Sequence, residues 1–207
     1  MNRRQFVVGA AILTLLGPAL VLAGRQAVGE SIQLYEDDRI LGDAEAKVTI
    51  IEYASLTCPH CATLHTDIMP RIKSEWIDTG KARLVYRHFP LDGVALRAAA
   101  LTDCLPAERH YAFLDMLFEG QQQWARADDP VAALGQRAKL AGLSQSEIDS
   151  CLADEAAMAK IMERRKEGSE LYDVDSTPTL IIDGHKLSGT RSYEEIEKVL
   201  QEAAQGS

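Results

Sequence analysis

The sequence has little positive charge, and this shortage excludes a class of function. Among its 207 residues, 22 Lys and Arg stand against 31 Asp and Glu, which gives a formal net charge of −9. So acidic a chain is a poor match for nucleic acid or for an anionic membrane surface, and we expect no nucleic-acid partner. The excess negative charge is better explained by solubility.

The four cysteines lack the neighbours that metal and haem sites need. Cys58 and Cys61 form one Cys-x-x-Cys pair, whereas Cys104 and Cys151 are each isolated. A four-ligand zinc site would require a second pair of Cys or His at similar spacing. A c-type haem site would require His directly after the second Cys, where the chain has Ala62. We therefore expect no metal and no cofactor.

A long apolar run lies at the N-terminus, over residues 6–23. Arg3 and Arg4 precede it, and Val21-Leu22-Ala23 ends it in the small-x-small pattern of a cleavage site. Residues 1–23 are therefore expected to be a cleaved export signal. An uncleaved membrane anchor is the alternative, which the interruption at Gly17-Pro18 disfavours. The two arginines also match the core of a twin-arginine signal, although they suit the general secretory route as well.

Cys58-Pro59-His60-Cys61 lies where a predicted strand is followed by a predicted helix. The β-branched run Val48–Ala54 precedes the motif, and apolar residues at helical spacing follow it over residues 59–78. Backbone N–H groups in the first turn of a helix are unpaired and partly positive, so a sulfur there is stabilised as thiolate. Cys61 is one helical turn from Cys58, close enough for a disulfide. The motif predicts a reversible dithiol–disulfide couple, with a purely structural disulfide as the alternative.

The other elements follow from hydrophobic periodicity and turn signals. Strands are expected at residues 31–35, 47–54, 82–88, 179–182 and 186–188. Helices are expected at residues 59–78, with a kink near Met69 caused by Pro70, throughout residues 93–172, and after a capping box at Ser192. Without the helical block, the order is strand–helix–strand and then strand–strand–helix, which is the thioredoxin arrangement. The predicted fold class is α/β, a thioredoxin-like fold with an inserted all-helical subdomain: residues 24–92 and 173–207 form its two parts, and residues 93–172 the insertion.

Taken together, these features resemble the DsbA family of exported thiol–disulfide oxidoreductases. The resemblance covers essentially the whole mature chain and rests on Cys58-Pro59-His60-Cys61, the helical insertion, Phe89-Pro90-Leu91-Asp92 and Thr177-Pro178. It implies that Cys58 is the nucleophile and Cys61 the buried resolving thiol. It also implies a periplasmic, monomeric enzyme that introduces disulfides into unfolded or reduced exported proteins. A quinone-linked membrane partner of the DsbB type would restore its oxidised form.

The same resemblance assigns roles to residues around the cysteines. Thr177 and Pro178 match the cis-proline loop that binds substrate peptide, together with Pro59. His60 is the residue best placed to stabilise the Cys58 thiolate. Glu52, a lone carboxylate in an apolar strand, matches the buried acid that relays a proton for Cys61, and a solvated glutamate is the alternative.

Two further groups of residues have alternative interpretations. Cys104 and Cys151 are expected to form a structural disulfide, because unpaired thiols are a liability in an oxidising compartment and related proteins carry such a pair. Two buried free thiols are the alternative. His65, one turn after Cys61, could tune the site or be a structural histidine.

Two other functions compete with the oxidase. A disulfide isomerase or reductase of this fold usually carries a substantial N-terminal oligomerisation segment, and residues 24–46 are short for that role. A chaperone-like peptide-binding module would not need both Cys58 and Cys61. The oxidase is therefore the favoured function.

Overall fold

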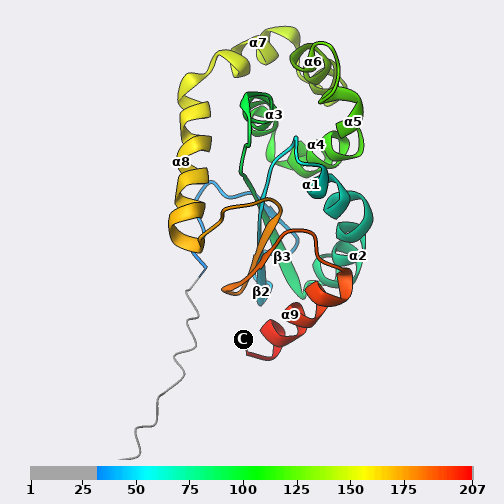
Figure 1. The fold of residues 1–207 in the computed structure, drawn as a ribbon, viewed down its shortest axis with the longest axis vertical. Helices are drawn as coiled ribbons and strands as arrows, with labels where there is room; N and C mark the ends of the chain where they lie inside the picture. The colour runs from blue at the N-terminus through cyan, green and yellow to red at the C-terminus, as the bar shows by residue number, and fades with distance from the viewer. Residues whose placement is uncertain (1–31, 207) are drawn as a thin grey trace, which may run out of the picture.

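The computed structural model describes residues 32–206, so the predicted signal peptide at residues 1–23 lies outside the described residues. At the centre of the described chain is a five-stranded mixed sheet, with helices packed around it (Figure 1). The strands are β1 (Ile40–Leu41), β2 (Val48–Ala54), β3 (Ala82–His88), β4 (Thr179–Ile182) and β5 (His185–Ser188). Their order in the sheet is β1-β3-β2-β4-β5.

The central strand explains why the sheet is mixed. β2 pairs in parallel with β3 and antiparallel with β4, and it is buried at every position. Strands covered on both faces have near-continuous apolar sequences, as this one does. Glu52 is the acidic exception within β2, opposite Tyr86 of β3 and Leu180 of β4.

Helical segments occupy the connections and the C-terminus. They are α1 (Pro59–Thr63), the π-helical turn η1 (Leu64–Ile68), α2 (Met69–Ile72), the π-helical turn η2 (Lys73–Ile77), α3 (Gly93–Cys104), α4 (Ala107–Glu119), α5 (Gln121–Trp124), α6 (Pro130–Leu140), α7 (Gln145–Ala153), α8 (Glu155–Tyr172) and α9 (Tyr193–Gly206). The predicted fold class is confirmed: β1 to β3 and β4 to α9 form a thioredoxin-like unit, and only helices lie between β3 and β4.

Different elements pack on the two faces of the sheet. On one face, Ile50 packs with Ile72 of α2 and Ile196 of α9. On the other face, Ile51 and Val174 belong to a separate apolar cluster. This cluster lies beside the N-terminal arm, which is the segment of residues 32–39 before β1, and beside the end of α8. Figure 1 shows α9 and α8 on different sides of the strands. Alternate residues of β2 thus serve two cores, as the period of a strand requires.

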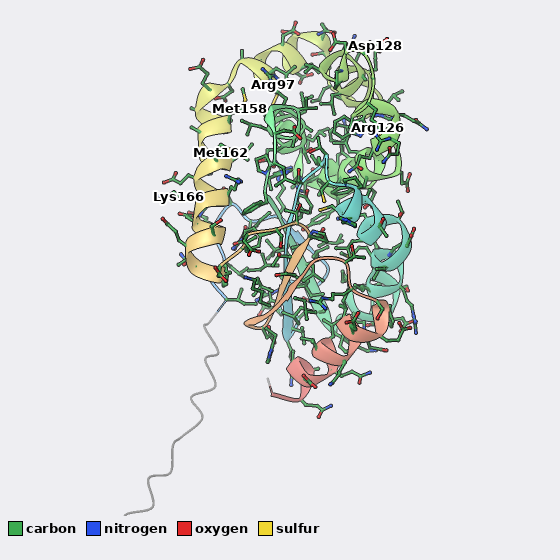
Figure 2. The ribbon with its side chains drawn as sticks, in the orientation of Figure 1. Arg97, Arg126, Asp128, Met158, Met162 and Lys166 are labelled. Atoms are coloured by element: carbon green, nitrogen blue, oxygen red, sulfur yellow. A yellow bond between two sulfur atoms is a disulfide. The ribbon has the colours of Figure 1, made fainter. Side chains whose placement is uncertain are left out.

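The helical insertion has an apolar core of its own, and that core extends to the turn that carries Cys58 and Cys61, called the active-site turn below. Phe113, Leu117 and Trp124 are buried in one cluster with both Cys58 and Cys61. A smaller cluster of α3 alanines with Ile161 and Met158 joins α3 to α8, and Figure 2 labels Met158 on α8. Packing of the insertion is therefore continuous with the packing of the dithiol.

A glycine allows α8 to approach the sheet closely. A Cβ added at Gly168 would lie 2.5 Å from the ring of Tyr53 in β2. The Tyr53 hydroxyl accepts a hydrogen bond of 2.9 Å from Arg87 of β3, and Arg87 forms a buried ion pair of 2.6 Å with Asp38 of the arm. The arm, the sheet and α8 therefore meet at one point.

The strand predicted at residues 31–35 is wrong. The described part of this segment, residues 32–35, contains no strand, and the edge strand is instead β1, antiparallel to β3. Side chains satisfy the backbone groups that a strand would have paired. The Gln33 carbonyl accepts a hydrogen bond from Arg87, and the Tyr35 N–H donates to Asp38.

The helix at residues 59–78 forms, but its geometry is less regular than the periodicity suggested. Two π-helical turns interrupt it, and Ile68 has φ −117° directly before Met69 and Pro70. The departure from α geometry lies at the predicted point, because proline removes a hydrogen-bond donor there. The short helix α5 lies within the block at residues 93–172 that the sequence predicts to be helical. Among the described residues, no helix is both long and apolar enough to cross a membrane.

Candidate active site

Cys58 is the N-cap residue of α1, with extended backbone angles, and Pro59 follows at the first helical position. The Cys58 carbonyl accepts hydrogen bonds from the N–H groups of Cys61 and Ala62, at 3.1 and 3.2 Å. Both active-site cysteines are free thiols; Cys58 is 6% exposed and Cys61 is fully buried. The structure therefore represents the reduced dithiol, in which Cys58 retains slight exposure and Cys61 has none.

The environment of Cys58 favours its thiolate. A hydrogen bond from the Cys61 thiol is the largest influence, and with the Thr177 side chain and the backbone N–H groups of Cys61 and His60 it lowers the pKa of Cys58 to about 5, although burial opposes this. The Thr177 carbonyl oxygen, 3.4 Å from Cys58 Sγ, accepts from the thiol form. The groups that favour the thiolate prevail, so Cys58 is ionised at neutral pH.

Cys61 has the opposite environment. Burial raises the pKa of the Cys61 thiol far above its usual range, and the neighbouring Cys58 sulfur and Glu52 raise it further. Two cysteines of one motif thus differ in protonation at neutral pH. A thiolate at Cys58 has the chemical character of a nucleophile and of a leaving group, whereas the Cys61 thiol keeps its proton.

The predicted substrate loop lies against Cys58. The Thr177–Pro178 peptide bond is cis, and Thr177 is 9% exposed beside the Cys58 sulfur. Pro59, the residue after Cys58, is exposed. A hollow of about 180 Å³ adjoins Pro59, with polar residues of the active-site turn and of the insertion along it: Thr57, Asp92, Gln121, Gln122 and Arg126.

His60 is exposed, and its ring Nδ1 lies 3.1 Å from the Thr190 hydroxyl. Among the main influences on the pKa of Cys58, His60 contributes through its backbone N–H. The contribution predicted for the imidazole stays a prediction. The backbone contribution follows from the helix start, because the free N–H groups there are available to the sulfur whatever the side chain is.

Glu52 lies beneath the cysteines and is fully buried. Its two carboxylate oxygens are 3.0 and 3.1 Å from His65 Nε2. The His65 ring stacks on Phe118 of α4, with ring centroids 4.0 Å apart. Glu52 is therefore not a solvated glutamate, and His65 is its direct partner.

The comparisons with known proteins agree with this geometry. The family model described as Thioredoxin matches residues 35–202. The crystal structure of Wolbachia pipientis alpha-DsbA1 superposes with a TM-score of 0.78 and 30% sequence identity, covering 86% of this chain and 96% of that one. The chain belongs to the DsbA family. BdbD from Bacillus subtilis shares the fold, with a TM-score of 0.73, 22% identity, and coverage of 82% of this chain and 94% of that one.

Two sequence relatives carry names from disulfide chemistry. "Disulfide bond formation protein D" of Bacillus subtilis is 25% identical over 175 residues, which are 81% of this chain and 77% of the relative. A Rickettsia bellii protein named as a protein-disulfide oxidoreductase is 28% identical over 155 residues, or 74% of this chain. The match spans only 60% of the Rickettsia protein.

Two contacts of this DsbA-family site were not predicted from the sequence. Gln121 of α5 is buried and donates to the carbonyl oxygens of Leu56 and Cys58, both at 2.9 Å. The Thr57 hydroxyl donates to Asp92 at 2.7 Å, and Asp92 also caps α3. Nothing in the local sequence marks Gln121, because its partners lie more than 60 residues away. The insertion therefore fixes the active-site turn by hydrogen bonds as well as by apolar packing.

Cys104 and Cys151 are joined by a disulfide in the structure, with their Cα atoms 6.2 Å apart. The bond connects the end of α3 to α7. It lies within the insertion, and the redox-active pair is separate from it. The described residues 32–206 hold no group of three or more His, Cys, Asp and Glu side chains arranged to bind a metal ion.

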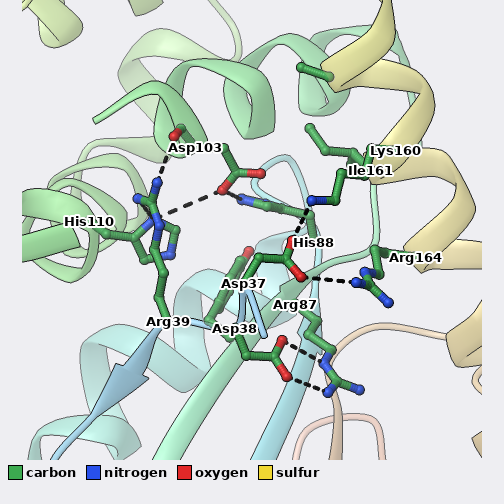
Figure 3. Close-up of a pocket in the computed structure, with 12 residues that line it drawn as sticks. Asp37, Asp38, Arg39, Arg87, His88, Asp103, His110, Lys160, Ile161 and Arg164 are labelled. Atoms are coloured by element: carbon green, nitrogen blue, oxygen red, sulfur yellow. Dashed lines mark hydrogen bonds and ion pairs between the residues drawn. The ribbon is translucent and has the colours of Figure 1, made fainter. Parts of the chain in front are cut away.

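A polar cavity of about 340 Å³ lies away from the cysteines, between the arm, β3 and α8 (Figure 3). Its polar side chains contact one another: Asp37 forms ion pairs with Lys160 and Arg164, at 2.6 and 2.9 Å, and His88 Nε2 lies 3.2 Å from Asp103 Oδ1. These contacts join the arm to α8 and β3 to α3.

Proposed function

We propose that the protein is a thiol–disulfide oxidoreductase that introduces disulfide bonds into exported proteins through Cys58 and Cys61. The observation that carries this proposal is the difference between the two cysteines: the pKa of the slightly exposed Cys58 is lowered to about 5, whereas the pKa of the fully buried Cys61 is raised. Membership of the DsbA family supports it.

The reaction begins with the oxidised pair. A substrate thiolate attacks Cys58 Sγ, the Cys58–Cys61 bond breaks, and the Cys61 sulfur leaves as a thiolate that takes up a proton. A second substrate thiolate then attacks the substrate sulfur of the mixed disulfide, and Cys58 leaves as a thiolate. Two electrons pass from the substrate to the enzyme. The last step benefits from the low pKa of Cys58, because a stable thiolate is a better leaving group.

The surrounding residues have assigned roles in this scheme. Thr177 and Pro178, with Pro59, hold the substrate peptide beside Cys58, and His60 borders the same surface. Glu52 accepts or returns the proton of Cys61. The Cys104–Cys151 disulfide stabilises the insertion and takes no part in exchange.

The cellular setting follows from the same function. The substrates are unfolded or reduced cysteine-containing proteins in the periplasm, which the enzyme reaches through a cleaved signal at residues 1–23. A membrane reoxidase of the DsbB type, linked to quinone, accepts the electrons and restores the Cys58–Cys61 disulfide.

Trapping of intermediates tests this function. The oxidised protein, mixed with reduced unfolded ribonuclease A, should restore ribonuclease activity while Cys58 and Cys61 become reduced. The Cys61→Ser variant should form a stable mixed disulfide at Cys58 when it meets a disulfide-bonded client, and it should not turn over. Unchanged behaviour of Cys61→Ser would identify a peptide-binding module. Activity on scrambled ribonuclease alone, with none on the reduced form, would identify an isomerase.

A further inference from the structure

A buried histidine lies within the active site without touching the reacting sulfur of Cys58. The His65 side chain is 3% exposed, and its Nε2 lies against both oxygens of Glu52. Among the described residues, these are the hydrogen bonds that the Glu52 carboxylate receives from side chains. A fully buried carboxylate with a neutral partner would tend to take up a proton, since burial disfavours the charged form.

The second nitrogen of the imidazole faces another carboxylate. His65 Nδ1 lies 3.5 Å from Asp115 Oδ1, on α4, and the Asp115 side chain is 55% exposed. A ring with a carboxylate at each nitrogen is matched by the doubly protonated form, in which both nitrogens carry hydrogen. Burial lowers the pKa of His65, but Glu52 and Asp115 outweigh burial and raise it to about 9. His65 is therefore a cation at neutral pH.

The groups that face His65 come from every neighbouring element. Glu52 lies on β2 and Asp115 on α4, and the Tyr86 ring of β3 makes an edge contact at 6.0 Å. Burial, with a smaller effect of Glu52, raises the pKa of Tyr86 well above its usual range, so its hydroxyl stays neutral. His65 is therefore the cation in direct contact with Glu52.

We propose that His65 is a positioning residue that keeps Glu52 ionised, so that Glu52 acts as the base for Cys61, and that Asp115 holds the imidazolium in place. The inference rests on the proposed function, because it takes Cys61 to be the resolving thiol. In the step concerned, the Cys61 proton passes to Glu52 and the Cys61 thiolate attacks Cys58 Sγ of a mixed disulfide. The Cys58–Cys61 bond forms, the bond to the outer sulfur breaks, and the outer thiolate leaves with the electron pair and takes a proton from water.

The step can be measured alone with oxidised glutathione. Reduced protein reacts with it in two stages: attack by Cys58, which depends on glutathione concentration, and then attack by Cys61, which does not. At saturating glutathione, stopped-flow fluorescence with acid-quench mass analysis from pH 4 to 9 gives the first-order rate of the Cys61 step. In the wild type, this rate should rise at low pH and reach a plateau once the base is ionised.

His65→Gln retains a hydrogen-bond donor but removes the charge. The rising limb of the profile should then move to higher pH by about one unit or more, a tenfold change in proton concentration. In Glu52→Gln, the rate of the Cys61 step should no longer reach a plateau as pH rises. In the double variant with His65→Gln, the pH profile of this rate should be the same as in Glu52→Gln alone. The control His110→Gln removes another buried histidine and should leave the limb in place.

An unmoved limb in His65→Gln, or an equal shift in the Glu52→Gln background, would overturn the inference. If the proposed function itself fails, the wild type will lack the glutathione-dependent first stage, which is a different result. Should circular dichroism show that His65→Gln does not fold, nitrogen-15 NMR of the wild-type imidazole decides. Two protonated nitrogens at pH 7 support the inference, a neutral ring contradicts it, and Asp115→Asn should lower the pH at which the ring loses its proton.

Discussion

The reduction potential of the Cys58–Cys61 couple should change its pH dependence near pH 5. The structure lowers the pKa of Cys58 to about 5, chiefly through the hydrogen bond from Cys61, while it keeps Cys61 protonated. Below pH 5, reduction of the disulfide takes up two protons, and above pH 5 it takes up one. For a two-electron couple, the potential should therefore fall by about 59 mV per pH unit below this point and by about 30 mV above it.

The magnitude at neutral pH follows from the same pKa. A depressed pKa stabilises the form that carries the thiolate, and the stabilisation is lost as pH falls through the pKa in the folded protein. At pH 7 the solution lies two units above the pKa of about 5. At about 1.4 kcal/mol per unit, the reduced form gains about 3 kcal/mol, which makes the couple about 60 mV more oxidising than one with an ordinary thiol.

Equilibration with glutathione from pH 4 to pH 8 tests this prediction. Alkylation and peptide mapping should follow Cys58 and Cys61 separately from the Cys104–Cys151 bond. Exchange is slow in acid, so each equilibrium should be approached from both the oxidised and the reduced protein. Reduction of oxidised glutathione takes up two protons in this range, whereas reduction of the protein takes up only one above pH 5. The equilibrium constant for reduction of the protein by glutathione should therefore rise about tenfold per pH unit above pH 5. A slope of 59 mV per unit that continues to pH 8 would refute the low pKa of Cys58.

Three further tests by substitution concern the insertion disulfide, the active-site turn and the packing of two helices. Cys104→Ser with Cys151→Ser opens a loop with a sequence separation of 47 and should lower the free energy of unfolding by about 4 kcal/mol in urea titrations, with an unchanged potential at the active site. Gln121→Leu leaves two carbonyls without their donor and should cost about 1–3 kcal/mol, together with a shifted pKa of Cys58 measured by alkylation rate. Gly168→Ala forces a methyl group into a buried ring and should cost about 1–3 kcal/mol, whereas Gly135→Ala, with its nearest neighbour at 3.9 Å, should stabilise α6 by about 0.5–1 kcal/mol. Stability unchanged by Gly168→Ala would show that α8 does not pack on the sheet as described.

Local signals in the sequence were sufficient for the thioredoxin-like core. The uniform burial of β2 follows from its apolar run, and the start of α1 from Cys58 and Pro59. The hairpin between β4 and β5 follows from Asp183-Gly184, which have positive φ angles of 43° and 87°. Each of these features depends on residues a few positions apart, so periodicity and turn chemistry could identify it.

The strand wrongly predicted at residues 31–35 shows the limit of local signals, because side chains pair with the backbone of this segment. The backbone around residues 33–38 is paired with Arg87 and Asp38, so tertiary hydrogen bonds replaced the ladder that a strand would have used. The active-site contacts of Gln121 are of the same kind. A polar residue in a helical block gives no sign in sequence that it will be buried, because its partners become neighbours only after the insertion has packed.

The inserted helices therefore do more than cover the dithiol. α5 supplies the Gln121 amide that holds the carbonyls of the active-site turn, and α4 supplies both the ring on which His65 stacks and the Asp115 carboxylate. The thioredoxin-like part contributes the sulfurs and Glu52. Since the insertion packs on both cysteines and donates a hydrogen bond to the Cys58 carbonyl, we expect the redox properties to respond to packing changes in the insertion even where overall stability is preserved. Substitutions of the α4 residues that contact His65 should change the pH profile of thiol–disulfide exchange even in variants whose fold is unchanged.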